Sequence, residues 1–236
     1  MGVVGPATSA GAARAEPPVL WGRYCQQVPW RVQGAWIRES NVATMDEQRD
    51  LKRQVREDYR RVLGRAADRT GRPLAERLYS PEELEGMPQS AVEAALGLGN
   101  PIAAADITPG QTVLDLGCGA GIDTFLAARR VGPSGRAIGL DLTPEMVELT
   151  RRNAAEAGLR NVEVVQGDME DLSFLPGESL DAVLCNGVLN LCAEKDKALA
   201  EIHRVLRPGG CVVLCDMVVN GEVPEQVLAN PAAWSG

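Results

Sequence analysis

The chain has 236 residues, of which 45% are hydrophobic and 24% are charged, and these are the values of an ordinary globular protein that buries a full apolar core. Its 24 Lys and Arg against 32 Asp and Glu give a formal net charge of −8, so its long-range field repels phosphate backbones and anionic membrane surfaces. No apolar run approaches the roughly 20 residues that cross a bilayer. Composition and charge therefore argue against a disordered chain, a membrane-spanning protein and a nucleic-acid-binding protein.

The cysteines indicate a reducing environment. None of the six lies in a C-x-x-C pair, and four lie within apolar, strand-like stretches, as small buried side chains do. A disulfide framework is therefore not expected, and we predict a cytoplasmic protein. The N-terminus is rich in Ala and Gly but has no basic segment followed by an apolar one, so the sequence does not indicate a secretory signal.

Residues 1–44 differ from the rest of the chain. They contain three of the four Trp but no sustained helical or strand period, and we predict a disordered or loosely docked tail. A capping box follows, because Thr44 can accept from a backbone N–H while the side chain of Glu47 reaches back. An amphipathic helix is expected there, and residues 45–236 are predicted to form the folded domain. The charged side of this helix, 56–61, is either a solvated surface or part of a helix that closes over a ligand.

From residue 112 onward, strand-like and helix-like segments alternate. Five apolar segments are expected to be strands, at 112–116, 136–141, 162–166, 181–186 and 211–218. Helical patterns lie between them at 122–131, 144–157 and 194–206, and a turn is expected at 207–210. Near-continuous apolar strands that alternate with helices are typical of a parallel sheet covered on both faces. We therefore predict an α/β fold with a doubly wound, mostly parallel sheet.

A glycine-rich turn, Gly117-Cys118-Gly119-Ala120-Gly121, ends the first of these strands and opens the following helix. Glycine lets the backbone turn tightly and approach a ligand closely, and the helix N-terminus offers unpaired N–H groups. Dinucleotide-binding proteins carry G-x-G-x-x-G aimed at a pyrophosphate, whereas this turn reads G-x-G-x-G with Asp115 two residues before it. A carboxylate beside the turn suits a cationic amine better than a pyrophosphate, although a glycine turn can also serve only to reverse the chain.

A carboxylate lies at the end of the second strand and another lies just after the third. Asp141 lies at the end of the second strand, 26 positions after Asp115, where an acid can accept hydrogen bonds from both ribose hydroxyls of an adenosine. The third strand is followed by Gly167, Asp168 and Met169, which offer a carboxylate for an exocyclic amine and a thioether for an adenine face. All these groups lie at carboxyl ends of strands, where open α/β sheets bind ligands. An adenosine joined to an amino acid matches them, and S-adenosylmethionine is such a compound.

The segment 112–218 resembles the class I S-adenosylmethionine-dependent methyltransferases. VLDLGCGAG at 113–121 is similar to their first motif, and LRPGG at 206–210 is similar to a motif before their fifth strand. The resemblance implies a Rossmann-like fold in which the glycine turn holds the methionine end of the donor and Asn186 faces the transferred methyl group. The residues expected to bind this cofactor are Asp115, Gly117, Cys118, Gly119, Gly121, Asp141, Leu142, Met146, Gly167, Asp168, Met169 and Asn186.

A closer resemblance, from about residue 55 to the end, is to the arsenite methyltransferases. It is carried by YSPEEL at 79–84, LGLGNP at 96–101, GIDTFLAA at 121–128, DLTPEM at 141–146 and NGVLNL at 186–191. That family transfers a methyl group to trivalent arsenic held by cysteine thiolates. Arsenic(III) is thiophilic and its lone pair is the nucleophile, so positioning carries most of the rate and no general base is required.

The chain departs from the arsenite methyltransferase pattern at its cysteines. Leu98 stands where the family has a loop cysteine, Gly187 stands where it has a second, and the chain ends before a third. Cys185 and Cys192 flank position 187 and are candidates to substitute in part, although a buried strand residue and a loop thiol are the simpler interpretations. Asn186, Cys185 and Cys192 are the predicted catalytic residues, and no metal site is predicted.

Three functions stay open on this sequence. The first is methyl transfer to arsenite, and the second is methyl transfer to oxygen, nitrogen or carbon of a small organic metabolite, which the loss of the family cysteines favours. The third is donor binding without catalysis. Asp123, just after the glycine turn, is expected either to help hold the donor or to cap the helix.

The C-terminal end is expected to leave the sheet incomplete. Only 18 residues follow Val218, which is too few for the two terminal strands that the class I resemblance implies. We therefore expect a C-terminally incomplete domain that lacks the terminal strand hairpin. The fifth strand is expected to have an open edge, which pairs with a partner or a second copy if the chain is not a fragment.

Overall fold

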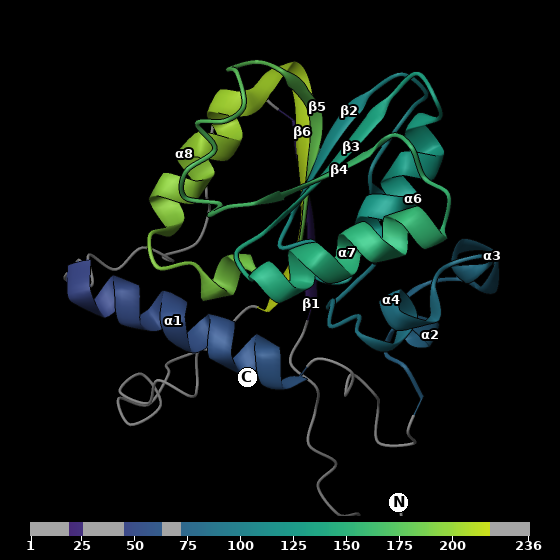
Figure 1. Ribbon diagram of the computed structural model, residues 1–236. Helices are drawn as coiled ribbons and strands as arrows, with labels where there is room; N and C mark the ends of the chain where they lie inside the picture. The colour runs from purple at the N-terminus through teal and green to yellow at the C-terminus, as the bar shows by residue number, and fades with distance from the viewer. Residues whose placement is uncertain (1–18, 26–44, 63–71, 218–236) are drawn as a thin grey trace, which may run out of the picture.

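The computed structural model describes residues 19–25, 45–62 and 72–217. Its centre is a six-stranded sheet with the order β1-β6-β5-β2-β3-β4 (Figure 1). Neighbouring strands are parallel except for β1, which runs antiparallel to β6. The strands are β1 (Val19–Cys25), β2 (Thr112–Leu116), β3 (Arg136–Asp141), β4 (Val162–Gln166), β5 (Leu180–Asn186) and β6 (Leu206–Met217). The predicted α/β fold with a doubly wound, mostly parallel sheet is confirmed.

Helices cover both faces of the sheet, with α8 on one side and α6 and α7 on the other (Figure 1). Successive residues of a central strand point to opposite faces, so Val113 packs in the apolar cluster that contains α6 whereas Leu114 packs in the one that contains α8. The helices are α1 (Met45–Val62), α2 (Ala75–Leu78), α3 (Pro81–Leu84), α4 (Gln89–Glu93), α5 (Pro101–Ala104), α6 (Ile122–Val131), α7 (Pro144–Glu156) and α8 (Lys195–Val205), with a 3-10 turn η1 (Leu189–Leu191). In the described part of the chain, no helix combines the length and apolar character needed to cross a membrane.

The last parallel strand, β6, does not have the open edge that the sequence predicted. β1 pairs with it residue by residue along all seven positions. The prediction of a tail over 1–44 is therefore wrong for these residues, while 1–18 and 26–44, including the capping residue Thr44, lie outside the described residues. The segment VLWGRYC has the apolar and aromatic composition of a strand. A single short strand far from the others in sequence leaves no repeating pattern to detect.

β6 also begins earlier than predicted. Its first residue is Leu206 instead of Cys211, so the expected turn lies inside the strand. The pairing with β5 shifts in register between Leu180, opposite Leu206, and Ala182, opposite Cys211, and the extra residues of β6 bulge from the ladder. Gly209 has a φ of 84°, which permits this local bend. The other four predicted strands agree with the structure to within one residue.

The turn between β2 and α6 depends on glycine for two different reasons. Gly117, Gly119 and Gly121 have φ values of 67°, 53° and 100°, in the left-handed region that a side chain disfavours. At Gly121 an added Cβ would also lie 2.4 Å from Cζ of Phe125 and 2.8 Å from Cγ2 of Thr150. At Gly119 an added Cβ would meet no atom within 4 Å. Conformation alone therefore requires Gly119, whereas close packing of α6 and α7 also requires Gly121.

Glu170, just after β4, joins two segments that lie far apart in the sequence. Its side chain is 2% exposed, and its Oε1 accepts hydrogen bonds from Sγ of Cys192 at 3.1 Å and from the N–H groups of Ala193 and Glu194 at 3.0 and 2.9 Å. Its Oε2 contacts Nζ of Lys52 in α1. Burial opposes ionisation, but the hydrogen bonds outweigh it and hold the pKa of Glu170 below its ordinary value. One carboxylate therefore fastens both α1 and the segment before α8.

Replacement of Gly121 by Ala is expected to cost more stability than the same change at Gly119. Both variants force a side chain into the left-handed region, at about 1–2 kcal/mol, and Gly121→Ala adds an overpacking cost of about 1–3 kcal/mol against Phe125 and Thr150. Urea denaturation followed by circular dichroism measures the free energy of unfolding of each variant. Equal losses for the two variants would contradict the packing role of Gly121.

Glu170→Gln is expected to lower the free energy of unfolding by about 1–3 kcal/mol. The amide lacks the negative charge of the carboxylate that accepts from four donors. Glu163→Gln is the matched control, since Glu163 pairs with Arg136 on the surface, where both side chains are about half exposed. Its expected effect is below about 0.5 kcal/mol. The same denaturation measurement compares the two, and an equal effect would show that Glu170 does not hold the two segments in place.

Candidate functional site

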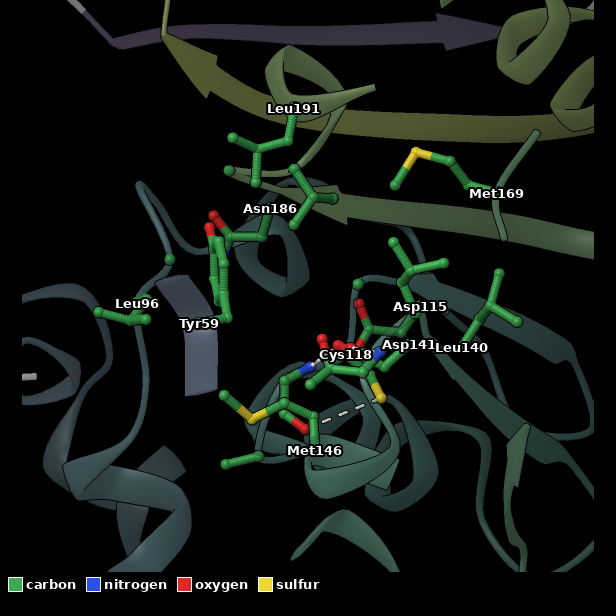
Figure 2. A pocket seen from close by; sticks show the side chains of 18 of the residues that line it. Tyr59, Leu96, Asp115, Cys118, Leu140, Asp141, Met146, Met169, Asn186 and Leu191 are labelled. Carbon is green, nitrogen blue, oxygen red and sulfur yellow. Dashed lines mark hydrogen bonds between the residues drawn. The ribbon is translucent and has the colours of Figure 1, made fainter. Parts of the chain in front are cut away.

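A pocket opens at the carboxyl edge of the parallel strands (Figure 2). It lies beyond the ends of β2 and β5, where the strand order reverses, and open α/β sheets bind their ligands at this position. The pocket contains about 1100 Å³ of space outside protein atoms, part of it open to solvent.

The structure brings together most of the residues that were predicted to bind the cofactor. Gly121 is the exception, because it lies behind the turn and packs against Phe125. Figure 2 shows Asp115, Asp141 and Cys118 close to one another at the glycine turn, with Met169 across the pocket. The predicted residues that line the pocket are Asp115, Gly117, Cys118, Gly119, Asp141, Leu142, Met146, Gly167, Asp168, Met169 and Asn186. Their contacts with a ligand stay predictions.

Three buried carboxylates line the pocket. Asp115, Asp123 and Asp141 are 3%, 5% and 9% exposed. Burial raises the pKa of all three, that of Asp123 to about 6, and the charges of Asp123 and Asp141 raise that of Asp115 further. Asp141 accepts hydrogen bonds from the N–H groups of Gly119 at 2.9 Å and Thr143 at 2.8 Å. Among the described residues no Lys or Arg forms an ion pair with these three, so the pocket carries negative charge suited to a cationic ligand.

Asp123 and Asn186 form one polar unit at this edge of the sheet. Oδ1 of Asp123 accepts a hydrogen bond from the hydroxyl of Tyr79, and Oδ2 accepts one from Nδ2 of Asn186, both at 2.9 Å. The alternative that Asp123 caps α6 is wrong, because the N-cap is Gly121 and no side chain caps this helix. The amide of Asn186 was expected to face the transferred methyl group, but its hydrogen bonds go to Asp123 and to the loop before α5.

Among the described cysteines, Cys118 and Cys192 line the pocket, whereas Cys185 does not. The prediction that Cys185 is catalytic is wrong, because this side chain is fully buried with Leu114 and Ile202 in the core, and burial raises the pKa of its thiol. Cys192 does line the pocket, but burial and the adjacent Glu170 raise its pKa to about 12, so the thiol stays protonated near neutral pH. Within the described residues, no three His, Cys, Asp or Glu side chains gather as a metal-binding group.

A face of α1 forms a wall of the pocket, and the sequence did not identify its residues. Lys52, Val55 and Tyr59 recur at helical spacing and all line the pocket. Nζ of Lys52 lies 2.7 Å from Oδ2 of Asp168, which fastens the helix beside the predicted adenine end. Burial, with the charge of Asp141, raises the pKa of Tyr59 to about 12, so its hydroxyl stays neutral. The structure supports both interpretations of this helix, because Val55 and Tyr59 face the pocket while Arg56 and Glu57 on its charged side are exposed.

Comparisons with known proteins agree with this geometry. A family model described as a methyltransferase domain matches residues 107–236. The arsenite methyltransferase of Halobacterium salinarum is 42% identical over 174 residues, which cover 73% of this chain and 44% of that protein. The nocamycin O-methyltransferase of Saccharothrix syringae is 41% identical over 109 residues, which cover 46% of this chain and 39% of that protein.

Among solved structures, the chain is similar to the arsenic(III) S-adenosylmethionine methyltransferase of Chlamydomonas reinhardtii. The TM-score is 0.59 at 35% identity, over 68% of this chain and 54% of that one. The chain spans about half the length of the curated arsenite methyltransferases that it matches. By its matching domain, its sheet and its glycine turn, the chain belongs to the class I S-adenosylmethionine-dependent methyltransferases and is similar to the arsenite methyltransferases among them.

Proposed function

We propose that this chain binds S-adenosylmethionine in the pocket and transfers its methyl group to a small-molecule acceptor, with trivalent arsenic as the acceptor. The observation that carries the proposal is a set of three buried carboxylates that have no cationic partner among the described residues. They lie beside the glycine turn, at the edge of the sheet where the strand order reverses. S-adenosylmethionine supplies a positively charged amine and sulfonium, and the sulfonium carries the methyl group. The donor set therefore fits its chemistry.

Different residues of the pocket hold different parts of this donor. In the proposal, Asp115 and the glycine turn bind the amino-acid end, and Asp141 accepts from the ribose hydroxyls. Asp168 and Met169 lie beside the adenine, where Lys52 of α1 pairs with Asp168. An arsenic(III) acceptor brings its own lone pair, so these residues need to position the two reactants and do not need to remove a proton.

The acceptor side differs from the arsenite methyltransferase pattern. The two positions at which that pattern has cysteines are Leu98 and Gly187, and an ideal Cβ on Gly187 would lie 3.2 Å from Cγ of Leu98. The two positions are therefore close in space, but in this chain they offer no thiol. We propose that arsenite reaches the pocket as its complex with a small soluble thiol, since trivalent arsenic prefers sulfur ligands.

A second candidate function is methyl transfer to a small organic metabolite. The observation that favours it is the apolar wall opposite the carboxylates, where Val55, Leu96 and Leu191 line the pocket together with the neutral hydroxyl of Tyr59. Such a surface suits an uncharged organic acceptor. The similarity to an O-methyltransferase over 46% of the chain is consistent with this candidate.

Radiolabelled S-adenosylmethionine tests the proposal. The label is expected to pass to arsenite in the presence of glutathione, and Leu98→Cys is expected to raise this rate by restoring a thiol. Asp141→Ala is expected to weaken donor binding about 10–100-fold, because a charged hydrogen-bond acceptor is lost. Glu163→Gln serves as the control variant with unchanged binding.

The outcomes separate the candidate functions. Transfer to components of a metabolite extract but not to arsenite would support the organic acceptor. Donor binding in calorimetry without transfer to any acceptor would support a binding protein that has no catalytic activity. A wild-type chain that binds neither S-adenosylmethionine nor its demethylated product would contradict the proposed function.

Donor binding is expected to tighten as the pH rises from 5 to 7. The pKa of Asp123 in the pocket is about 6, above the ordinary aspartate value of about 4. A cationic donor favours the ionised carboxylate, so binding below pH 6 releases a proton and affinity rises by up to about tenfold per pH unit. Calorimetry in buffers of different ionisation enthalpy measures this release. Asp123→Asn should flatten the profile, and a wild-type affinity that is constant over this range would refute the assignment.

A further inference from the structure

The side-chain amide of Asn186 has every hydrogen-bonding group in use. Its Oδ1 accepts from the N–H groups of Leu98 at 2.8 Å and Gly99 at 3.1 Å. Its Nδ2 donates to the carbonyl oxygen of Gly99 and to Oδ2 of Asp123, both at 2.9 Å, and lies 3.3 Å from the hydroxyl of Tyr79. An amide offers two acceptor positions and two donor hydrogens, so nothing is left for a ligand.

The loop held by this amide forms part of the pocket. Leu96 and Gly97 line it, and Gly97 packs directly on Asn186, because an ideal Cβ there would lie 2.4 Å from Nδ2. The far end of the loop is fixed independently, since Asn100 accepts from the N–H of Ala103 at 3.0 Å. Asn100 also donates to Oε2 of Glu83 at 2.9 Å. The amide of Asn186 therefore decides where the near end of the loop lies.

We infer that Asn186 is a positioning residue. Its amide fastens the part of the pocket wall formed by Leu96–Gly99, here called the acceptor wall, to the carboxylate of Asp123 on the donor side. Binding of the donor therefore sets the position of the acceptor wall. This inference rests on the proposed function. It assigns Asn186 a role that differs from contact with the transferred methyl group. It also explains why Gly97 is required at this place in the loop.

The chemistry of Asp123 supplies the connection. An ionised carboxylate can accept from Tyr79 on one oxygen and from Asn186 on the other, and both are observed. A protonated carboxyl keeps its contact with Tyr79 only if it donates to that hydroxyl, and its bonds to Tyr79 and Asn186 are then bonds between neutral groups, which are weaker. A bound cationic donor stabilises the ionised form and strengthens both hydrogen bonds, because charge-assisted bonds are the stronger ones. The stronger bond to Asp123 fixes the orientation of the Asn186 amide, and this orientation in turn fixes its hydrogen bonds to Leu98 and Gly99.

Amide hydrogen exchange of Leu98 and Gly99, followed by NMR with and without saturating S-adenosylmethionine, tests the inference. In the wild type the donor is expected to slow exchange of both amides by about tenfold or more, which corresponds to the strengthening of one charge-assisted bond. In Asn186→Ala both amides should exchange faster and gain no further protection from the donor. Gly97→Ala displaces the amide without deleting it, and it should show the same loss of donor-dependent protection.

Asn161→Ala is the matched control, because Asn161 also bonds two backbone carbonyls, those of Ala128 and Gly132, away from the pocket. It should leave the donor effect on Leu98 and Gly99 unchanged. Equal donor-dependent slowing in the wild type and in both site variants would overturn the inference, as would the absence of slowing in a wild type that binds the donor. Calorimetry on the same samples reports donor binding separately, so its failure in the wild type would identify an error in the proposed function itself.

Discussion

Buried negative charge is the constraint on which the rest of this structure depends. Removing a carboxylate from water costs several kcal/mol unless it is paired or hydrogen-bonded, and three carboxylates share one pocket here. Asp115 accepts from Oγ1 of Thr124 at 2.6 Å, and Asp141 accepts from two backbone N–H groups, so the protein stabilises part of the charge itself. The cost of burial that these hydrogen bonds do not offset raises the pKa of each of the three acids. A cationic ligand removes this penalty, which makes the same acids a source of affinity for a sulfonium donor.

Two polar side chains near the carboxyl ends of β4 and β5 hold the walls around this charge. Glu170 follows β4 and fastens α1 and the segment before α8, while Asn186 ends β5 and fastens the loop before α5. Both connect segments that are distant in the sequence, and both are nearly saturated with hydrogen bonds. The sheet fixes the places from which they act, because the carboxyl ends of parallel strands share one edge. The shape of the pocket is therefore set by polar contacts and not by apolar packing alone.

The sequence predicted the parts of this arrangement that repeat or that form a local motif. Alternating apolar strands and helices gave the sheet, and the glycine turn with Asp115 and Asp141 located the pocket. It could not predict β1, which is one short strand separated from its partner β6 by most of the chain. Cys185 was placed on the correct strand, and its burial in the core agrees with the simpler interpretation of this residue, whereas its predicted catalytic role is wrong.

The long-range polar contacts were also beyond the reach of the sequence. Lys52 and Glu170 are 118 positions apart in the sequence, and Leu98 and Asn186 are 88 positions apart. No local sequence pattern connects the two members of either pair. The sequence after residue 44 did indicate an amphipathic helix, but not the surface that this helix covers. A cytoplasmic location and the absence of a nucleic-acid partner rest on composition and stay predictions.

The protonation of Asp123 is the most direct test of a pocket built around unbalanced charge. Carbon-13 NMR of the labelled Asp side chains, with Asp123→Asn used to assign the signal, follows its titration with and without S-adenosylmethionine. In the free protein the midpoint should lie near pH 6, and a saturating donor should move it to lower pH. An ordinary aspartate midpoint in the free protein, or a midpoint that the bound donor leaves unchanged, would contradict the account.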